Sequence, residues 1–377
     1  MKIGHGLENT ATASVAYNPA HMTDSINVTI AMPLDEALVE LVRNVSPRVS
    51  LTHLSKAQRF VYRDGRPLWG GYREPPAPED ESEEEARKSL DAILGATEVL
   101  LSNQVLPDDI VARATVLKWL QLTSAGVDSL ADHEVVRAPG VMVTTASGIH
   151  AATISEYIVG AMISFAKNFT KSLRSQDERT WQPYWPRELE DATVGIIGLG
   201  AIGGRTAEVC RAMRMRVLAM RRSCERRMSG EEAGQASVDE MFPPADLHAL
   251  LAESDYVVLA LPLTDESTGL IGEAELAAMK PNAVIVNIAR GRVIDQEALV
   301  LALRDGGIAG AALDVTTPEP LPAEHELWGL PNVMITPHIS GGTPRYMERA
   351  IGLFCENLRR YAGSEALRNV VDPTRGY

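Results

Sequence analysis

The sequence predicts an α/β protein built from parallel sheets with helices on both faces. Short apolar runs, typical of buried strands, alternate with helical segments along most of the chain. The 377 residues are enough for two domains, and the 45% hydrophobic content predicts that they are globular. A glycine-rich turn also joins an apolar strand to a helical pattern, as in nucleotide-binding α/β domains.

The first half of the chain already shows this alternation. We expect a strand at Ser25–Met32 and an amphipathic helix at Leu34–Val42. Further buried strands are expected at Glu98–Leu101 and Trp119–Thr123, with a helix around Asp108–Ala114 between them. An order of this kind favours a parallel sheet.

The second half is more regular. A long apolar helix is expected at Ile154–Phe165, and a polar, tryptophan-containing segment follows it. The strands then predicted are Thr193–Ile197, Arg216–Met220, Val284–Ile288, Ala309–Leu313 and Val333–Thr336. A final helix is expected at Tyr346–Tyr361.

Charge and composition exclude several classes of partner. Lys and Arg number 36 against 50 Asp and Glu, so the formal charge of −14 disfavours nucleic acid and anionic membranes. The three cysteines have no metal-ligand spacing, which predicts no metal site and reduced thiols in a cytoplasmic protein. Residues 1–22 lack the apolar core of a secretory signal, which leaves a disordered extension or a natural start at Met22 as alternatives.

The glycine-rich turn has the pattern G-x-G-x-x-G. Gly198 permits a tight turn, Gly200 lets the backbone approach a pyrophosphate, and Gly203 lets the following helix pack closely. Ala201 and Ile202 complete this turn, where the helix N-terminus offers unpaired N–H groups. The alternative is a glycine turn that serves packing alone.

The residues after the second strand of this region predict the choice of cofactor. An acid that binds the ribose of NAD is expected about twenty residues after the glycines. Arg221, Arg222 and Ser223 stand there instead. Guanidinium groups bind a 2′-phosphate, so we expect NADP, with NAD and a solvated basic turn as the alternative.

Three side chains suited to carbonyl reduction each follow one of the last three predicted strands. They are Arg290, Glu319 and His338. Because ligands of open α/β sheets bind at the carboxyl ends of strands, these side chains can converge. Reducing a 2-oxo acid requires a cation for the carboxylate and a proton donor for the oxygen that becomes negative.

The residue types then suggest separate roles. We expect His338 to be the general acid/base, Glu319 its carboxylate partner, and Arg290 the group that binds substrate and polarises its carbonyl. The alternatives are a loop histidine, a surface acid and an arginine in a salt bridge. The joint appearance of the three after strands of one domain favours the catalytic interpretation.

From about Trp119 onward the chain resembles the D-isomer-specific 2-hydroxyacid dehydrogenase family, in its glyoxylate/hydroxypyruvate reductase-like form. The resemblance lies in LKWLQLTSAGVD, VGIIGLGAIG, LPLTDESTGLIG, KPNAVIVNIARGRVID, GAALDVTTPEPLP and LWGLPNVMITPHISGG. It implies a flavodoxin-like substrate domain made of residues 1–148 and 340–377. A dinucleotide-binding Rossmann domain, residues 149–339, is inserted between them, and a homodimer forms on the Rossmann domains.

The resemblance also implies roles for single residues. It makes Arg290, Glu319 and His338 catalytic, and it places Asp314 against the nicotinamide carboxamide. Substrate carboxylate is expected at the backbone amides of Ser124, Ala125 and Gly126. The remaining expected cofactor-binding residues are Pro262, Thr264 and Ile288.

The function that follows is NAD(P)H-dependent reduction of a small 2-oxo acid, of glyoxylate or hydroxypyruvate type, to the D-2-hydroxy acid. Alternatives are oxidation like that of phosphoglycerate dehydrogenase, and a dinucleotide-sensing protein like the corepressors of this fold. Glu319 disfavours formate, because formate-oxidising relatives carry Gln there, and Lys118 is misplaced for phosphite oxidation. His150 is expected to be structural, with substrate contact as the alternative.

Overall fold

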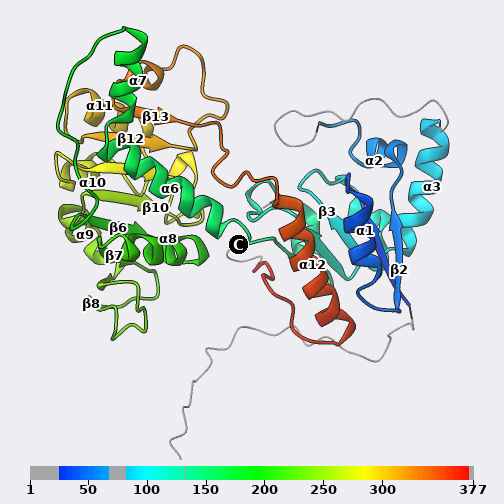
Figure 1. The fold of residues 1–377 in the computed structure, drawn as a ribbon. Coiled ribbons are helices and arrows are strands. Elements are labelled where there is room, and N and C mark those ends of the chain that lie inside the picture. The colour runs from blue at the N-terminus through cyan, green and yellow to red at the C-terminus, as the bar shows by residue number, and fades with distance from the viewer. Residues whose placement is uncertain (1–24, 68–81, 131, 373–377) are drawn as a thin grey trace, which may run out of the picture. The chain divides into compact units, whose positions relative to one another are not determined.

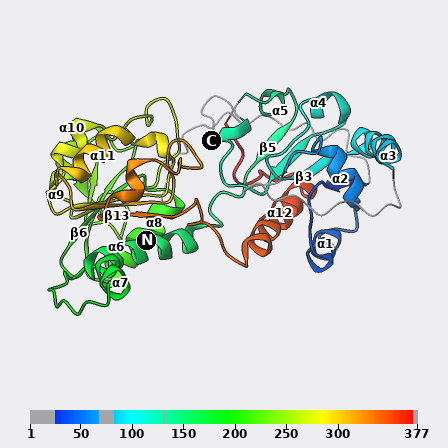
Figure 2. The same cartoon turned by 90° about the horizontal axis from the view of Figure 1, so that it is seen from above.

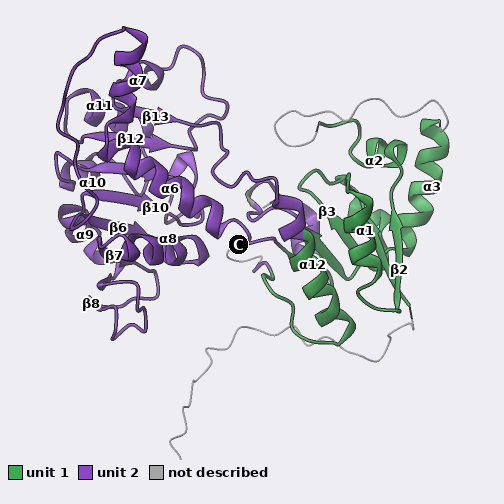
Figure 3. Cartoon of the chain, in the orientation of Figure 1, with its two compact units in different colours: residues 1–121, 138–144, 351–370 green, residues 122–137, 145–350, 371–377 purple. Residues whose placement is uncertain are grey.

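The computed structural model describes residues 25–67, 82–130 and 132–372 (Figures 1 and 2). These residues form two compact units (Figure 3). The first is made of the described residues within 1–121, 138–144 and 351–370, and the second of those within 122–137, 145–350 and 371–377. Residues 122–137, 145–148, 340–350 and 371–372 therefore group differently from the expected domain boundaries, which stay a prediction. The expected N-terminal extension, residues 1–22, lies outside the described residues.

A five-stranded sheet forms the centre of the first unit. Its strands, in spatial order, are β2 (Val49–His53), β1 (Ile26–Ile30), β3 (Val99–Ser102), β4 (Trp119–Leu122) and β5 (Met142–Thr144). Strand β1 pairs in parallel with β2 and β3, and β4 pairs in parallel with β5. The order 2-1-3-4-5 is that of flavodoxin-like sheets, as expected.

The helices that connect these strands are α1 (Glu36–Arg43), α2 (Lys56–Tyr62), α3 (Glu83–Ala96) and α4 (Ile110–Arg113). The C-terminal helix α12 (Tyr346–Ala362) belongs to this unit from Ile351 onward. The short α5 (Glu134–Arg137) precedes β5. Ser82 begins α3 with a capping box, because its hydroxyl accepts from the Glu85 N–H while the Glu85 carboxylate accepts from the Ser82 N–H.

The second unit contains an eight-stranded sheet. Its strands, in spatial order, are β13 (Val333–Ile335), β12 (Gly310–Leu313), β11 (Val284–Asn287), β10 (Tyr256–Leu259), β6 (Thr193–Ile197), β7 (Arg216–Met220), β9 (Glu240–Phe242) and β8 (Met228–Ser229). All neighbours pair in parallel except β8 and β9. The strand order reverses between β6 and β10. Doubly wound sheets bind dinucleotides at such a reversal, at the carboxyl ends of the strands.

The strands of this sheet are apolar on both faces, and the helices explain why. Ile197 and Val257 pack in one core with residues of α9 (Leu247–Glu253), α10 (Glu273–Ala278) and α11 (Gln296–Arg304). Their neighbours Ile196 and Val258 point the other way, into a core with α6 (Ala151–Ala166) and α8 (Ala201–Ala212). The sheet is therefore buried on both sides.

Most expected elements are confirmed, and the exceptions have a physical reason. Strands β6 and β7 have the predicted bounds, and the other predicted elements agree to within a few residues. The elements that the prediction did not name include β2, α2, α7 (Phe169–Asp177), β5 and β10. Strand β2 reads VSLTH, and its partly buried polar residues gave no apolar run to detect. In the described ranges no helix is long and apolar enough to cross a bilayer, and no His, Cys, Asp and Glu side chains cluster as metal ligands do.

A buried polar network joins the C-terminal helix to the first sheet. The side chain of Asn357 on α12 donates to the Gln121 side chain of β4 at 3.2 Å and to the Arg368 carbonyl at 3.1 Å. Gln121 also accepts from the Thr144 hydroxyl of β5, which in turn accepts from the Trp119 indole N–H at 2.7 Å. Polar groups buried in this way must stay paired, so the network fixes how the chain returns to this unit.

Replacing Asn357 with Leu should therefore destabilise the protein. The substitution keeps the branched shape and the number of side-chain heavy atoms but removes the donors and acceptor of a fully buried amide, at an expected cost of about 1–3 kcal/mol. Urea unfolding followed by circular dichroism measures the change. Arg359→Leu, on an exposed position of the same helix, should change stability by less than about 0.5 kcal/mol. Equal stability of the Asn357→Leu and wild-type proteins would contradict the structural role of this network.

Candidate functional site

The glycine-rich turn between β6 and α8 has the geometry of a phosphate-binding turn. Gly198 has a φ of +101°, and a Cβ there would collide with the Ala260 carbonyl group. A Cβ on Gly203 would collide with the carbonyl oxygen of Gly198, so only glycine lets α8 start this close to the strand. A Cβ on Gly200 would meet no atom within 4 Å, so space lies over this peptide.

The N-terminus of α8 fits the pyrophosphate of a dinucleotide. Gly200 is its N-cap, and no side chain caps the helix. The N–H groups of the first turn and the positive end of the helix dipole therefore favour an anion at this point. Ala201 is exposed and Ile202 is partly buried at the start of the helix. Together with the space over Gly200, these features fit the cofactor that the sequence predicts.

The predicted basic turn lies at the carboxyl end of β7. Arg221, Arg222 and Ser223 are all exposed. The turn closes through a hydrogen bond from the Cys224 N–H to the Arg221 carbonyl, at 2.9 Å. Arg222 also lies 3.8 Å from the Glu266 carboxylate, in the loop after β10. Two guanidinium groups therefore stand at the position where the ribose-binding acid of NAD-dependent enzymes was expected.

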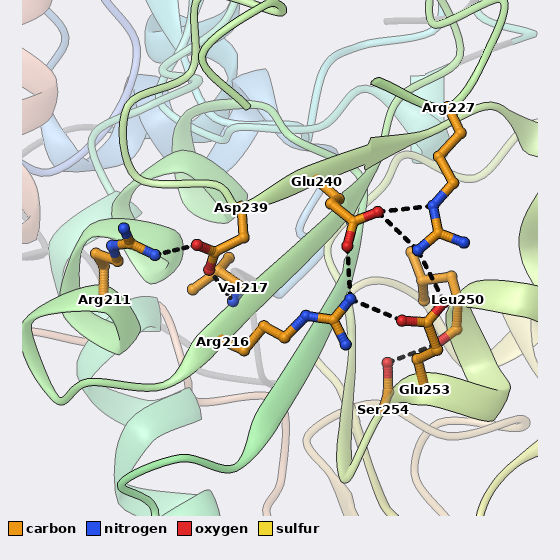
Figure 4. A network of polar contacts seen from close by, with 9 residues as sticks. All are labelled: Arg211, Arg216, Val217, Arg227, Asp239, Glu240, Leu250, Glu253 and Ser254. Atoms are coloured by element: carbon orange, nitrogen blue, oxygen red, sulfur yellow. Dashed lines mark hydrogen bonds and ion pairs between the residues drawn. The ribbon is translucent and has the colours of Figure 1, made fainter. Parts of the chain in front are cut away.

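An ion-pair network holds both ends of the segment that carries this basic turn (Figure 4). Glu240 accepts from Arg216 at 2.6 Å and from Arg227 at 2.7 Å, and Glu253 of α9 accepts from Arg216 at 2.7 Å. Asp239 pairs with Arg211 and accepts from the Val217 N–H at 2.8 Å. Residues 227, 239 and 240, which follow the basic turn, are thereby bound to β7 and α9.

The two arginines of this network also lower the pKa of Glu240. Burial alone would raise the pKa of Glu240, but the hydrogen bonds and charges of Arg216 and Arg227 outweigh it and hold the pKa below its usual value. The guanidinium carbon of Arg227 also lies 4.3 Å from the ring centre of Phe242, a cation–π contact. Glu240 therefore remains ionised at neutral pH.

Arg290 lies in the turn that follows β11. Asn287, which is fully buried, holds this turn, because its side-chain amide donates to the Arg290 carbonyl and its Oδ1 accepts from the Ala289 N–H, both at 3.0 Å. A Cβ on Gly291 would collide with the Thr316 carbonyl group, so this turn lies directly against the loop that follows β12. The Arg290 side chain is partly exposed, and its Nη1 donates to the Ala289 carbonyl at 2.7 Å.

The structure brings Glu319 and His338 into contact. Oε2 of Glu319 lies 2.8 Å from Nδ1 of His338, and Oε1 of Glu319 accepts from the Thr316 N–H at 3.1 Å. The side chains remain accessible, at 39% exposure for Glu319 and 40% for His338. A carboxylate at Nδ1 fixes the ring orientation and the tautomer in which Nδ1 carries the proton. Their catalytic roles stay a prediction.

Asp314 is 2% exposed and its carboxylate has three partners. It accepts from the Thr336 hydroxyl at 2.6 Å, from the Ile339 N–H at 2.8 Å and from the Ser340 N–H at 2.9 Å. These donors flank His338, so Asp314 holds the turn that carries the imidazole. The expected contact of Asp314 with a nicotinamide carboxamide stays a prediction.

The predicted substrate turn, residues 124–126, is linked by a series of contacts to the segment that follows His338. The Ser124 carbonyl accepts from the Ala146 N–H at 2.8 Å, and the neighbouring Thr123 carbonyl accepts from the Tyr346 hydroxyl at 2.8 Å. The Tyr346 ring lies 4.9 Å from the His150 ring.

His150 completes this series. Its Nδ1 lies 3.2 Å from the carbonyl oxygen of Gly341, three residues after His338. At 8% exposure, and with burial lowering its pKa, His150 is a neutral donor to that carbonyl. These contacts favour the structural interpretation of His150.

The other predicted residues differ in exposure. Ala125 is exposed and Gly126 is partly buried, and the Gly126 carbonyl accepts from the Ser124 hydroxyl at 3.0 Å. Pro262 is exposed and Thr264 is partly exposed, in a loop that the buried Ser267 closes by donating to the Pro262 carbonyl at 2.8 Å. Ile288 is buried at the end of β11.

Sequence reasoning missed three residues that support the site. Asn287 could have been noticed, because an asparagine at the end of an apolar strand commonly pairs with the turn that follows. Thr336 and Tyr157 gave no signal. The hydroxyl of Tyr157 lies 2.7 Å from that of Thr336, but on an apolar helix a tyrosine is typical of a core residue.

Three comparisons with known proteins agree with this geometry. Residues 159–340 match the model of the NAD binding domain of D-isomer specific 2-hydroxyacid dehydrogenases. The chain is 32% identical over 317 residues to a glyoxylate reductase of Aeropyrum pernix, covering 81% of this chain and 89% of that one. It is also 32% identical to a D-3-phosphoglycerate dehydrogenase of Archaeoglobus fulgidus, covering 73% of this chain but 51% of that one.

A solved structure shares the fold over nearly the whole length. A D-isomer specific 2-hydroxyacid dehydrogenase from Xanthobacter autotrophicus, in complex with NADPH and MES, superposes with a TM-score of 0.73 at 27% identity. The superposition covers 94% of this chain and all of that one.

Proposed function

This chain belongs to the D-isomer specific 2-hydroxyacid dehydrogenase family of NAD(P)-dependent oxidoreductases, and on that premise we propose that it reduces a small 2-oxo acid to the D-2-hydroxy acid. The observation that carries the proposal is the contact between Glu319 and His338, with Nδ1 engaged by the carboxylate. In that arrangement Nε2 is the ring atom that can reach a substrate oxygen.

The chemistry divides between cofactor and protein. A dinucleotide held at the glycine turn and the N-terminus of α8 would supply the hydride. His338 donates a proton to the oxo oxygen as negative charge develops there, and Glu319 stabilises the imidazolium and holds its orientation. Arg290 binds the substrate carboxylate and polarises the carbonyl, acting as a fixed positive charge on a chain whose net charge is −14. The backbone amides of Ser124, Ala125 and Gly126 would hold the same carboxylate.

The proposed substrate class is glyoxylate or hydroxypyruvate. Several relatives at 32–36% identity are glyoxylate reductases, including those of Aeropyrum pernix and Thermofilum pendens. Oxidation of a phosphoglycerate is the second candidate, favoured by the similarity to D-3-phosphoglycerate dehydrogenases. The chain spans about half the length of those enzymes, which makes this candidate the weaker one.

The proposed cofactor is NADPH. Arg221 and Arg222 stand at the carboxyl end of β7, where their guanidinium groups would pair with a 2′-phosphate. The ion-pair network around Glu240 fixes the segment that presents them, so the contact is preorganised. The related structure from Xanthobacter autotrophicus holds NADPH.

We also propose that the chain forms a homodimer through the second unit. Trp181 and Trp185 are 95% and 97% exposed, in the segment that follows α7. On α7 itself, Phe169 and Leu173 are 48% and 61% exposed. Apolar side chains gathered in this way mark an interaction surface, and a second copy is the partner that the family suggests. The three cysteines are buried free thiols, in keeping with the proposed cytoplasmic location.

Turnover tests the proposed activity directly. The protein should oxidise NADPH in the presence of glyoxylate or hydroxypyruvate, and His338→Gln should lower kcat by about 10²–10⁴-fold while leaving the Kd for NADPH nearly unchanged. Absorbance of NADPH measures the first quantity and fluorescence titration the second. His248→Gln, an exposed histidine that pairs with Glu275, is the matched control and should keep full activity.

Other outcomes would count against this activity. Tight NADPH binding without turnover of any 2-oxo acid would favour a sensor. Oxidation of 3-phosphoglycerate alone would favour the second candidate. Equal loss of activity and cofactor affinity in His338→Gln would contradict the assigned role of the imidazole.

Cofactor preference tests the basic turn. Replacing Arg221 and Arg222 together with Ala should lower kcat/KM for NADPH by about 10–100-fold, because charge-assisted bonds to the phosphate are lost. The value for NADH should change by less than about threefold, since NADH has no 2′-phosphate. Arg226→Ala, in the same segment but paired with Glu232, is the control. A wild-type preference for NADH would contradict the proposal.

Light scattering on a sizing column tests the dimer. The wild-type protein should elute with the mass of two 40.9 kDa chains, and replacing Trp181 and Trp185 with Ser should shift it towards one. Trp328→Ser removes an exposed tryptophan that lies outside residues 169–185 and should leave the mass unchanged. A monomeric wild-type protein, or a double variant that remains a dimer, would exclude this interface.

A further inference from the structure

A chain of hydroxyl groups runs from α6 to the turn that carries His338. The Tyr157 hydroxyl lies 2.7 Å from the Thr336 hydroxyl, which donates to the Asp314 carboxylate at 2.6 Å. A threonine hydroxyl has a single proton, and here Asp314 accepts it. Tyr157 must therefore be the donor to Thr336. Every hydrogen bond in this relay, which runs from Tyr157 through Thr336 to Asp314, thus has a defined direction.

The far end of the relay fixes the backbone around His338. The Asp314 carboxylate accepts from the N–H groups of Ile339 and Ser340, and the Asp314 carbonyl accepts from the His338 N–H at 2.9 Å. His338 has a φ of +54°, a left-handed conformation that is unfavourable for a residue with a Cβ. Such a conformation persists when surrounding bonds over-determine it, and Asp314 supplies those bonds.

The near end of the relay is anchored to the phosphate-binding helix. Ser155 lies on α6, two residues before Tyr157, and its hydroxyl accepts from that of Thr206 on α8 at 3.2 Å. Both of these hydroxyls are buried, and α6 and α8 share one apolar core. Helix α6 therefore connects the helix that would hold the pyrophosphate to the turn that carries the imidazole.

Burial keeps Tyr157 a donor throughout the useful pH range. Burial, together with the nearby Asp314 carboxylate, raises the pKa of Tyr157 to about 12, although the bond with Thr336 opposes the shift. The hydroxyl thus keeps its proton wherever the enzyme is assayed.

We propose that Tyr157 and Thr336 are positioning residues. They act through Asp314 to keep the imidazole of His338 at a fixed position and orientation relative to α8, the cofactor-binding helix. The inference rests on the proposed reductase function for its catalytic consequence. Its structural content is independent of turnover, because it concerns which orientation and tautomer the His338 ring adopts. If a hydrogen bond of the relay is removed, we expect the His338 ring to lose its contact with Glu319, whereas the glycine turn and α8 keep their structure.

Paired substitutions at Thr336 test this role. Thr336→Val keeps the shape and removes the hydroxyl, so it should lower kcat by roughly 10–100-fold, the cost of about 1 Å of misplacement. The Kd for NADPH should remain within about twofold of wild type, since α8 is untouched. Thr336→Ser restores the hydroxyl and should recover most of the activity, and Tyr157→Phe, which removes one bond of the relay, should fall between these two variants.

A second readout does not require turnover. Imidazole ¹⁵N chemical shifts report which ring nitrogen carries the proton, and the His338 signals are those that vanish in His338→Gln. In the wild type the neutral ring should carry its proton on Nδ1, facing Glu319. In Thr336→Val a mixture of tautomers should appear, whereas Tyr256→Phe, which removes the hydroxyl of a buried tyrosine of β10, should change neither spectrum nor kcat.

The possible outcomes distinguish a failure of the positioning role of Thr336 from a failure of the proposed reductase activity. Wild-type kcat and unchanged ¹⁵N shifts in Thr336→Val would overturn the relay, as would a Thr336→Ser variant as impaired as Thr336→Val. A wild-type protein that reduces no 2-oxo acid would remove the proposed function, but the ¹⁵N shifts would still decide whether Thr336 orients the ring.

Discussion

The parallel direction of β11, β12 and β13 is the constraint on which the candidate site depends. Three strands that run the same way end at the same edge, so the turns after them are neighbours although they are far apart in sequence. The contact between Gly291 and the Thr316 carbonyl joins the first two turns, and the 2.8 Å contact between Glu319 and His338 joins the last two. An antiparallel neighbour would have carried its turn to the opposite edge.

Two of the three turns, those of Arg290 and His338, are held by a buried polar residue rather than by their exposed functional side chains. Asn287 holds the turn of Arg290, and Asp314 holds that of His338. This division follows from solvation, because Arg290, Glu319 and His338 must remain accessible to a substrate and cannot also be buried. The left-handed conformation of His338 is stabilised by its neighbours in the same way.

Much of this arrangement could be predicted from the sequence. Apolar strands and a glycine turn have local signatures, so β6, β7 and the turn at Gly198 were expected where they lie. The approach of Glu319 to His338 could also be expected, from the rule for strand ends. The role of Tyr157 could not, because helical periodicity assigns it to the core and only the folded chain shows its hydroxyl against Thr336. Likewise, the polar strand β2 became visible only through its pairing with β1.

The central claim is that the imidazole of His338, oriented by Glu319, faces the oxo oxygen of a substrate whose carboxylate Arg290 binds. A crystal structure with NADPH and oxamate, an unreactive analogue of a 2-oxo acid, tests this claim most directly. The account predicts a hydrogen bond of about 2.6–3.2 Å from Nε2 of His338 to the oxamate amide oxygen, with the Arg290 guanidinium on the carboxylate. Oxamate bound beside the nicotinamide with His338 directed elsewhere would contradict it.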